Sequence, residues 1–231
     1  LDSGSPNAWT RDGDRIDIEV LDHPEVPDDG TVGAVVVSVG AISGGTPGGF
    51  VGGHPGGSDY TGTSNVNVLD GEVRSNMMVI PIDGAPYVSL QTLNIADVVV
   101  DVLGYVTSDA APASTSGLYT TIAPTRTVDS RIAVGTTRLA GLDSREVSVP
   151  TPATGASAVS QNITATGTSA PGYISAHPGP TPPVVSSVNY EAAGQTRAAF
   201  AFTTVSDDDT TFFTSLVAAD LVVDVVGYFS D

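Results

Sequence analysis

Three acidic loops contain the side chains best suited to binding a metal ion. They are Arg11–Asp14 ("RDGD"), Pro27–Gly30 ("PDDG") and Ser206–Thr210 ("SDDDT"). Calcium takes about six to eight oxygen ligands, and closely spaced aspartates supply them from loops. No loop has the spacing of an EF-hand, so these residues suit either a calcium site or ordinary acidic turns. The candidate calcium ligands are Asp12, Asp14, Asp28, Asp29, Asp207, Asp208 and Asp209.

Two further aspartates lie inside runs of apolar residues: Asp101 in "ADVVVDVLGY" and Asp224 in "ADLVVDVVGY". An ionised carboxylate among valines is costly unless it is paired or accepts several hydrogen bonds. We expect a buried structural bond to backbone N–H groups or to an arginine, which for Asp224 is Arg126 or Arg131. A role as a metal ligand is the alternative. Gly4 stands where the first half would need a counterpart of Arg131.

Asparagines near these aspartates suggest a polar belt that ties strand ends together. Asn162 and Asn189 accompany Asp224, and Asn67 precedes Asp101 at a place that matches Asn189. Asparagine side chains satisfy backbone groups at turns, so we expect a structural role. A sugar-binding site is the alternative.

The histidines offer little for catalysis. His54 and His177 each stand in a His-Pro-Gly turn, and the chain has only three histidines. Isolated histidines are poor material for a metal site or a Ser-His-Asp triad. We expect turn residues that pack on their neighbours. Aromatic side chains are a further candidate, as a stacking surface for glycans, but most of them lie within strand motifs and are expected to pack there.

The chain is an internal duplication. An offset of 123 residues (224 − 101) maps Asp101 onto Asp224 and the "HPG" of residues 54–56 onto that of residues 177–179. Allowing a one-residue shift, Ser38 matches Ser160. The segment "TSDAAPASTSG" between the copies has the composition of a linker. We predict a first domain of residues 1–108, a linker of 109–118 and a second domain of 119–231.

Short β-favouring runs separated by Gly, Pro, Asp and Ser fill each copy, and no segment keeps helical periodicity beyond two turns. This pattern predicts an all-β fold, with two tandem antiparallel β-sandwich domains of jelly-roll type. In the last strand both faces are apolar, with Val223 and Val225 on one and Val222 on the other. We therefore expect the closing strand to lie in the middle of a sheet.

Charge and composition exclude several classes of partner. The formal charge is −18, and all eight basic residues are arginines. So acidic a chain lacks the basic clusters that bind nucleic-acid phosphates or anionic lipids. There is no cysteine, and no apolar run approaches the roughly 20 residues of a membrane span. We expect neither nucleic-acid binding nor insertion into a membrane.

The second copy contains "YTTIAPTRTVDSR", "GYISAHPG", "SSVNYEAAGQT" and "ADLVVDVVGYF" over Tyr119–Phe229. This series resembles a repeat of secreted and cell-surface proteins of actinobacteria and related bacteria. The resemblance implies an extracellular accessory module without identifying a ligand. The first copy opens at "LDSG", equivalent to "VDSR", and lacks the motif upstream of it. A neighbouring subunit or an upstream segment would fill such a gap by strand addition.

These observations favour a non-catalytic structural or adhesive module at the cell surface, in a filamentous or other extracellular assembly. Its expected partners are other subunits or domains of a longer chain, and no cofactor is expected unless calcium binds the acidic loops. A carbohydrate-binding accessory module is the alternative. An enzyme is the least favoured class, because no nucleophile and base or paired-carboxylate motif stands out.

Overall fold

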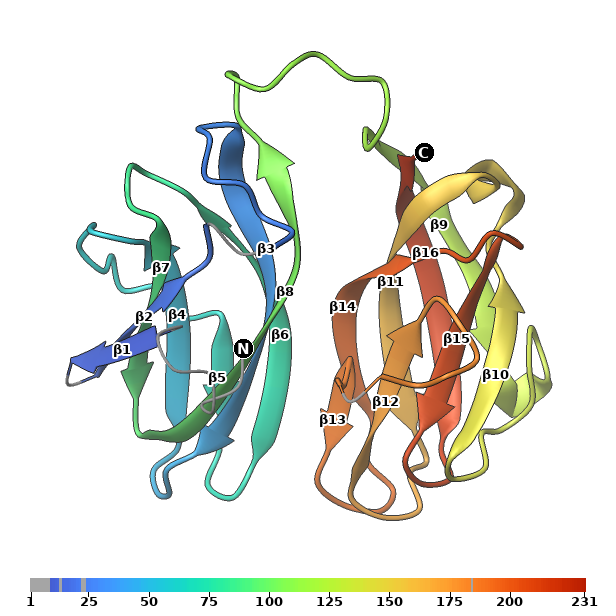
Figure 1. The fold of residues 1–231 in the computed structure, drawn as a ribbon. Coiled ribbons are helices and arrows are strands. Elements are labelled where there is room, and N and C mark those ends of the chain that lie inside the picture. The colour runs from blue at the N-terminus through green and yellow to red at the C-terminus, as the bar shows by residue number, and fades with distance from the viewer. Residues whose placement is uncertain (1–8, 13, 22–23, 184) are drawn as a thin grey trace. The chain divides into compact units, whose positions relative to one another are not determined.

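The computed structural model describes residues 9–12, 14–21, 24–183 and 185–231. Strands dominate this part of the chain, in which the only helical elements are two 3₁₀ turns, η1 (Ser130–Ile132) and η2 (Thr151–Ala153) (Figure 1). Four sheets form, and their paired strands run antiparallel. The predicted antiparallel all-β fold is confirmed. The "LDSG" segment lies outside the described residues.

The chain divides into two compact units, Leu1–Ala113 and Ser114–Asp231. The division falls inside the segment 109–118 that has the composition of a linker. Each unit contains two of the four sheets and its own hydrophobic core.

The second unit contains eight strands in two four-stranded sheets. One sheet has the order β14-β11-β16-β9 and the other has the order β10-β15-β12-β13. The strands are β9 (Tyr119–Asp129), β10 (Asp143–Ser148), β11 (Ala156–Thr166), β12 (Gly172–His177), β13 (Val188–Tyr190), β14 (Arg197–Thr204), β15 (Thr210–Ser215) and β16 (Asp220–Ser230).

Four antiparallel pairs explain this strand order. The first strand of the unit pairs with the last (β9 and β16), the second with the seventh (β10 and β15), the third with the sixth (β11 and β14) and the fourth with the fifth (β12 and β13). A long ribbon of four such pairs, wrapped so that alternate pairs fall in opposite sheets, is the jelly roll. The second unit is therefore a complete jelly roll.

The first unit has three of these pairs. They are β2 with β7, β3 with β6 and β4 with β5, and β8 takes the place of β16. The sheets have the orders β6-β3-β8 and β1-β2-β7-β4-β5. The strands are β1 (Trp9–Asp12), β2 (Arg15–Glu19), β3 (Val32–Ser43), β4 (Gly49–Pro55), β5 (Val66–Val68), β6 (Val73–Pro81), β7 (Tyr87–Leu93) and β8 (Ile95–Thr107).

No described strand of the first unit corresponds to β9. Strand β16 lies between β11 and β9, as its two apolar faces predicted. Strand β8 pairs only with β3 among the described residues and lies at the edge of its sheet. The prediction of a central closing strand, made for the last strand of the chain, is thus confirmed.

The two cores have similar chemistry and are separate. In the first unit, alternate residues of β3, including Val35, Val37 and Val39, pack with Leu90 of β7. In the second unit, Phe213 of β15 is fully buried within the corresponding cluster. Period-two alternation along each strand places these side chains between the two sheets.

Register also corrects one match between the copies. Asp101 lies opposite Ser38, and Asp224 lies opposite Asn162. Ser38 therefore corresponds to Asn162 and not to Ser160. The interruptions of register in both pairings show why a single offset misaligns these strands.

Candidate functional site

Arg126 of β9 holds Asp224 of β16 with a two-pronged bond. The arginine Nε donates to Oδ1 at 2.9 Å and Nη2 donates to Oδ2 at 3.0 Å. The two residues face each other in the register of β9 and β16. The arginine is half-exposed and the carboxylate is partly exposed. The sequence analysis expected a buried pair, so the partner is confirmed but the burial is not. The pair ties the first strand of the unit to the last.

Arg131 has a different partner from the expected one. It holds Asp129, with Nε donating to Oδ1 at 2.8 Å and Nη2 to Oδ2 at 2.7 Å. The Asp129 side chain is only 4% exposed. The hydrogen bonds from Arg131 hold the pKa of Asp129 below its usual value. Asp129, which the sequence analysis did not select, is thus more deeply buried than Asp224.

Asp101 has the same place on β8 but a different environment. Among the described residues, its carboxylate has neither a hydrogen-bond partner nor an ion-pair partner. Burial of the group raises its pKa, because desolvation disfavours the charged form. The expected bond to arginine or backbone is therefore absent from the described part of the first unit, which has no strand in the position of β9 to supply it.

The asparagines do not form one belt. Asn162 lies next to Asp224 across β11 and β16, and its Nδ2 donates to Thr164 Oγ1 at 3.3 Å. Asn189 lies in β13, opposite Tyr173 of β12, and therefore in the other sheet. Alternate pairs of a jelly roll belong to opposite sheets, which separates residues that the sequence suggested would meet.

Asn67 repeats the placement of Asn189. It lies in β5 opposite Phe50 of β4, and its Nδ2 donates to Ser64 Oγ at 3.2 Å. Both asparagines therefore face an aromatic residue across the shortest pair of the unit. Their role in the fold is equivalent, as the duplication predicts.

The acidic loops form turns. Asp29 accepts a hydrogen bond from the Thr31 backbone N–H at 3.0 Å, and Asp209 accepts one from the Gly155 N–H at 2.6 Å. Four of the other aspartates are exposed: Asp14, Asp28, Asp207 and Asp208. The side chain of Asp12 is not among those that the structure describes. Within residues 14–21, 24–183 and 185–231 no three His, Asp or Glu side chains gather to hold a metal ion. The loops are thus not brought together as a calcium site there.

A serine, a histidine and an aspartate meet across three strands of the first unit. Ser89 of β7 lies opposite Asp17 of β2 on one side and His54 of β4 on the other. Sequence reasoning missed this row because the three residues are far apart in the chain and only strand register aligns them. Because serine, histidine and aspartate also form the catalytic triad of many hydrolases, we compared this row with the geometry of that triad.

The row fails that test. Ser89 Oγ donates to Asp17 Oδ1 at 2.6 Å, so its proton is directed to the carboxylate, and the serine is 0% exposed. His54 Nδ1 contacts Pro55 O and Ser58 Oγ, and its Nε2 is buried without a hydrogen-bond partner. A serine nucleophile needs a base at its hydroxyl and access for substrate. The row instead ties three strands together.

His177 is likewise structural. Its Nε2 contacts Thr214 Oγ1 at 2.9 Å, and its ring stacks on Phe212 with centroids 6.0 Å apart. Burial lowers its pKa because the charged imidazolium is desolvated. It is a turn residue that packs on its neighbours.

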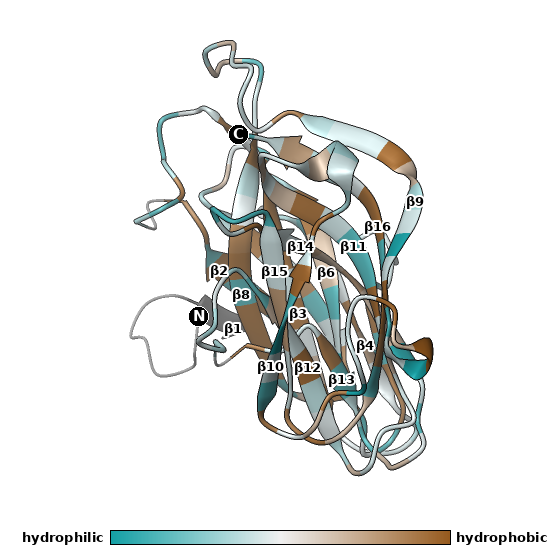
Figure 2. Ribbon diagram, turned by 90° about the vertical axis from the view of Figure 1, so that its right-hand side faces the viewer, coloured by the Kyte–Doolittle hydropathy of each residue, from teal (hydrophilic) through white to brown (hydrophobic). Residues whose placement is uncertain are grey.

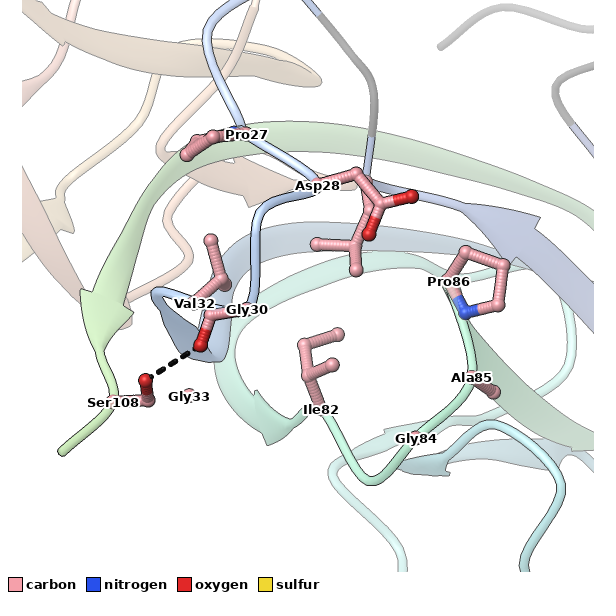
Figure 3. Close-up of a pocket in the computed structure, with 11 residues that line it drawn as sticks. Pro27, Asp28, Gly30, Val32, Gly33, Ile82, Gly84, Ala85, Pro86 and Ser108 are labelled. Atoms are coloured by element: carbon pink, nitrogen blue, oxygen red, sulfur yellow. Dashed lines mark hydrogen bonds between the residues drawn. The ribbon is translucent and has the colours of Figure 1, made fainter. Parts of the chain in front are cut away.

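An open cleft of about 510 Å³ lies at one end of the first unit. Figure 3 shows Pro27, Ile82 and Pro86 around it, with the Asp28 carboxylate nearby. Ser108 Oγ donates to Gly30 O at 2.8 Å and ties the end of β8 to the loop that precedes β3. The lining exposes polar atoms and apolar groups in nearly equal measure, with apolar side chains such as Ile82 beside the Asp28 carboxylate, so the cleft suits a small group with both polar and apolar faces.

The most unusual surface is the outer face of β8. Val99, Leu103 and Val106 are 49%, 45% and 49% exposed, whereas Val222, the counterpart of Val99 in β16, is 6% exposed. In Figure 2 the β8 ribbon is hydrophobic over most of its length. Contiguous exposed apolar residues on an edge strand mark an interaction surface. The described residues include no helix that is both long and apolar enough to cross a membrane.

Comparisons with known proteins assign the chain to no family. No protein-family model matches the chain, and no curated protein matches it. Among solved structures, the crystal structure of GK1651 from Geobacillus kaustophilus aligns over 94% of this chain and 92% of its own length, at 10% identity and a TM-score of 0.23. So low a TM-score carries no argument.

Proposed function

We propose that this chain is a non-catalytic structural or adhesive module of an extracellular assembly at a cell surface. The observation that carries the proposal is the exposed apolar strand β8, whose Val99, Leu103 and Val106 form a surface suited to a partner. A module with this role needs compact domains and a contact surface, and two β-rich units with an exposed apolar face on β8 would provide both.

The use of the polar side chains supports a structural role. Asp224 is held by Arg126, Asp129 by Arg131, and Ser89 donates to Asp17. Each contact joins residues that stabilise the sandwich, and each engages a group that catalysis would otherwise need. The sequence resemblance to secreted and cell-surface repeats supports the same location.

Labelling of intact cells tests this proposal. Antibodies raised against the chain should label unpermeabilised cells of the source organism, and the chain should sediment with envelope or filament material. Labelling that requires permeabilisation would overturn the cell-surface role. A strain without the gene is the control for antibody specificity.

The cleft favours carbohydrate binding as a second candidate. Its volume suits one or two sugar rings, Pro27 and Ile82 provide apolar contact, and the Asp28 carboxylate can accept hydrogen bonds from hydroxyl groups. A glycan array with the full chain tests it, with Asp28→Ala as the site variant. Absence of binding to any glycan, or equal binding by that variant, would exclude the cleft as the sugar site.

A further inference from the structure

A row of side chains crosses the outer face of the sheet β14-β11-β16-β9 in the second unit. Phe200 of β14 lies opposite Asn162 of β11, and Asn162 lies opposite Asp224 of β16. Arg126 of β9 completes the row opposite Asp224. Residues directly opposite one another across an antiparallel pair project on the same face of the sheet. Ile163, next to Asn162 in the chain, is buried in the core, so the row faces outward.

Aromatic rings extend from the Phe200 end of this row across the sheet. Phe200 and Phe202 meet edge to face with ring centroids 5.9 Å apart, and Phe202 meets Phe229 in the same way at 4.9 Å. The ring of Tyr119 lies 5.0 Å from that of Phe229. Ser160 of β11, opposite Phe202, is 0% exposed, whereas Phe200 and Tyr119 at the ends of the run are 37% and 46% exposed. The run therefore presents aromatic surface beside the polar part of the row.

The first unit shows that the fold does not require these rings. With the offset of 123 residues, aliphatic side chains occupy the positions of the three phenylalanines there: Met77, Val79 and Val106. Strand pairing supports the first of these matches, because Ser38 lies opposite Met77 as Asn162 lies opposite Phe200. A sheet of this kind thus forms with an aliphatic outer face, and the aromatic face of the second unit supplies chemistry that folding does not need.

The polar part of the row has spare capacity for hydrogen bonds. Asn162 Nδ2 donates one long bond, to Thr164 Oγ1 at 3.3 Å, and its Oδ1 has no partner among the described residues. The Asp224 carboxylate accepts the two prongs of Arg126, which leaves further lone pairs on both oxygens. The ion pair also fixes the carboxylate in place and neutralises its charge. The row can therefore both donate hydrogen bonds to a ligand and accept them from it.

A sugar ring matches both parts of this face. Its hydroxyl groups donate to and accept from amides and carboxylates, and its C–H groups pack on an aromatic ring. Charge narrows the class of sugar. The ion pair leaves no net charge at the centre of the row, and the formal charge of −18 repels acidic polysaccharides. The chemistry of the face thus selects a neutral glycan.

We propose that the outer face of β14-β11-β16-β9 binds a neutral polysaccharide, with one sugar ring packed on Phe200 and its hydroxyl groups bonded to Asn162 and Asp224. The aromatic run that continues to Tyr119 contacts the next sugars of the chain. Arg126 is a positioning residue, because it holds the Asp224 carboxylate. This site is separate from the cleft of the first unit, and it does not depend on any contact made by β8.

Affinity electrophoresis of the full chain in native gels tests the inference. The probes are mixed-linkage β-glucan, soluble starch, galactomannan and arabinan, each in a separate gel, and alginate is the acidic control. We expect at least one neutral polysaccharide to retard the chain, with an affinity that salt does not change, because a neutral ligand is not subject to ionic screening. Retardation by none of the four neutral probes, or equal retardation by alginate, would overturn the proposal.

Variants that carry the residues of the first unit locate the site. Phe200→Met and Asn162→Ser copy Met77 and Ser38, so each introduces a side chain that the same sheet position already accommodates. We expect each variant to bind at least about tenfold more weakly, with an unfolding temperature close to that of wild type. Met77→Ala at the equivalent place in the first unit and Asp28→Ala in the cleft are the matched controls, and both should bind like wild type.

Other outcomes assign the face or the sugar differently. Loss of binding in Asp28→Ala with unchanged binding in Phe200→Met would place the sugar in the cleft, and the proposal would be wrong. Self-association in sedimentation velocity that Phe200→Met abolishes, without retardation by any glycan, would make this face a contact between copies and would also overturn it. Labelling of intact cells is a separate readout, so the proposed structural role stands or fails independently of these results.

Discussion

The two units of this chain share one fold, but the described residues of the first unit include no strand in the place of β9. In the second unit the pair of β9 and β16 completes the jelly roll and supplies Arg126 to Asp224. In the first unit β8 retains the equivalent Asp101 without that partner among the described residues. The same closing-strand aspartate therefore has different described surroundings in the two units.

The comparison also separates residues that build the core from residues that receive a strand. Val35, Val37 and Leu90 of the first unit are fully buried although β3 is the only described strand that pairs with β8. Asp101 and Gly104 do not belong to that core, and their counterparts in the second unit are among the residues that pair with β9.

The largest expected effects come from the two cores. Phe213→Ala should lower the free energy of unfolding of the second unit by about 3–5 kcal/mol, and Leu90→Ala that of the first by about 2–5 kcal/mol. Because the clusters are separate, each variant should shift one transition in differential scanning calorimetry and leave the other in place. A single transition shifted as a whole by either variant would contradict the separation.

The next effect comes from the pair of Arg126 and Asp224. Arg126→Ala removes both bonds to the carboxylate and gives the second unit the state of the first. We expect a lower melting temperature for the second unit, with a smaller fall than for Phe213→Ala. Arg126→Lys keeps the charge and loses the fork, so it should lie between the two. A variant as stable as wild type would show that the pair does not stabilise β9.

Replacing Asp101 or Asp224 by asparagine should change stability by a smaller amount, and in opposite directions. Asp101→Asn removes a half-buried charge that has no ion pair among the described residues, and it should raise the stability of the first unit by less than about 1 kcal/mol. Asp224→Asn weakens the bond to Arg126 and should lower that of the second unit. Urea denaturation of both variants measures the signs. Two shifts in the same direction would show that the two environments are equivalent.

The smallest effect is the pH dependence of Asp101. Because its pKa is raised in the folded state, the folded chain binds that proton more tightly than the unfolded chain, and ionisation costs stability. The advantage of Asp101→Asn should be complete above the folded pKa and should shrink as pH falls through it. It should vanish below the ordinary value of 3.8. An advantage independent of pH would assign the effect to something other than charge.

Much of the fold could be predicted from the sequence, because it depends on local pattern. Alternation of apolar and polar residues predicted strands. The offset of 123 residues that relates Asp101 to Asp224 predicted that the two closing strands are equivalent. The candidate site could be predicted less well. Arg126 was one of two arginines considered for Asp224, and the row of Asp17, Ser89 and His54 gave no signal in sequence, since strand register alone brings it together.

The sequence by itself determined the all-β class and the duplication. Only the tertiary structure decided which of the described strands lies at an edge, because ribbon pairing links the first strand to the last across about a hundred residues of chain. It also decided that Asp224 is bound by Arg126 while Asp101 is not, since a carboxylate's partner depends on the strand beside it and not on the valines around it.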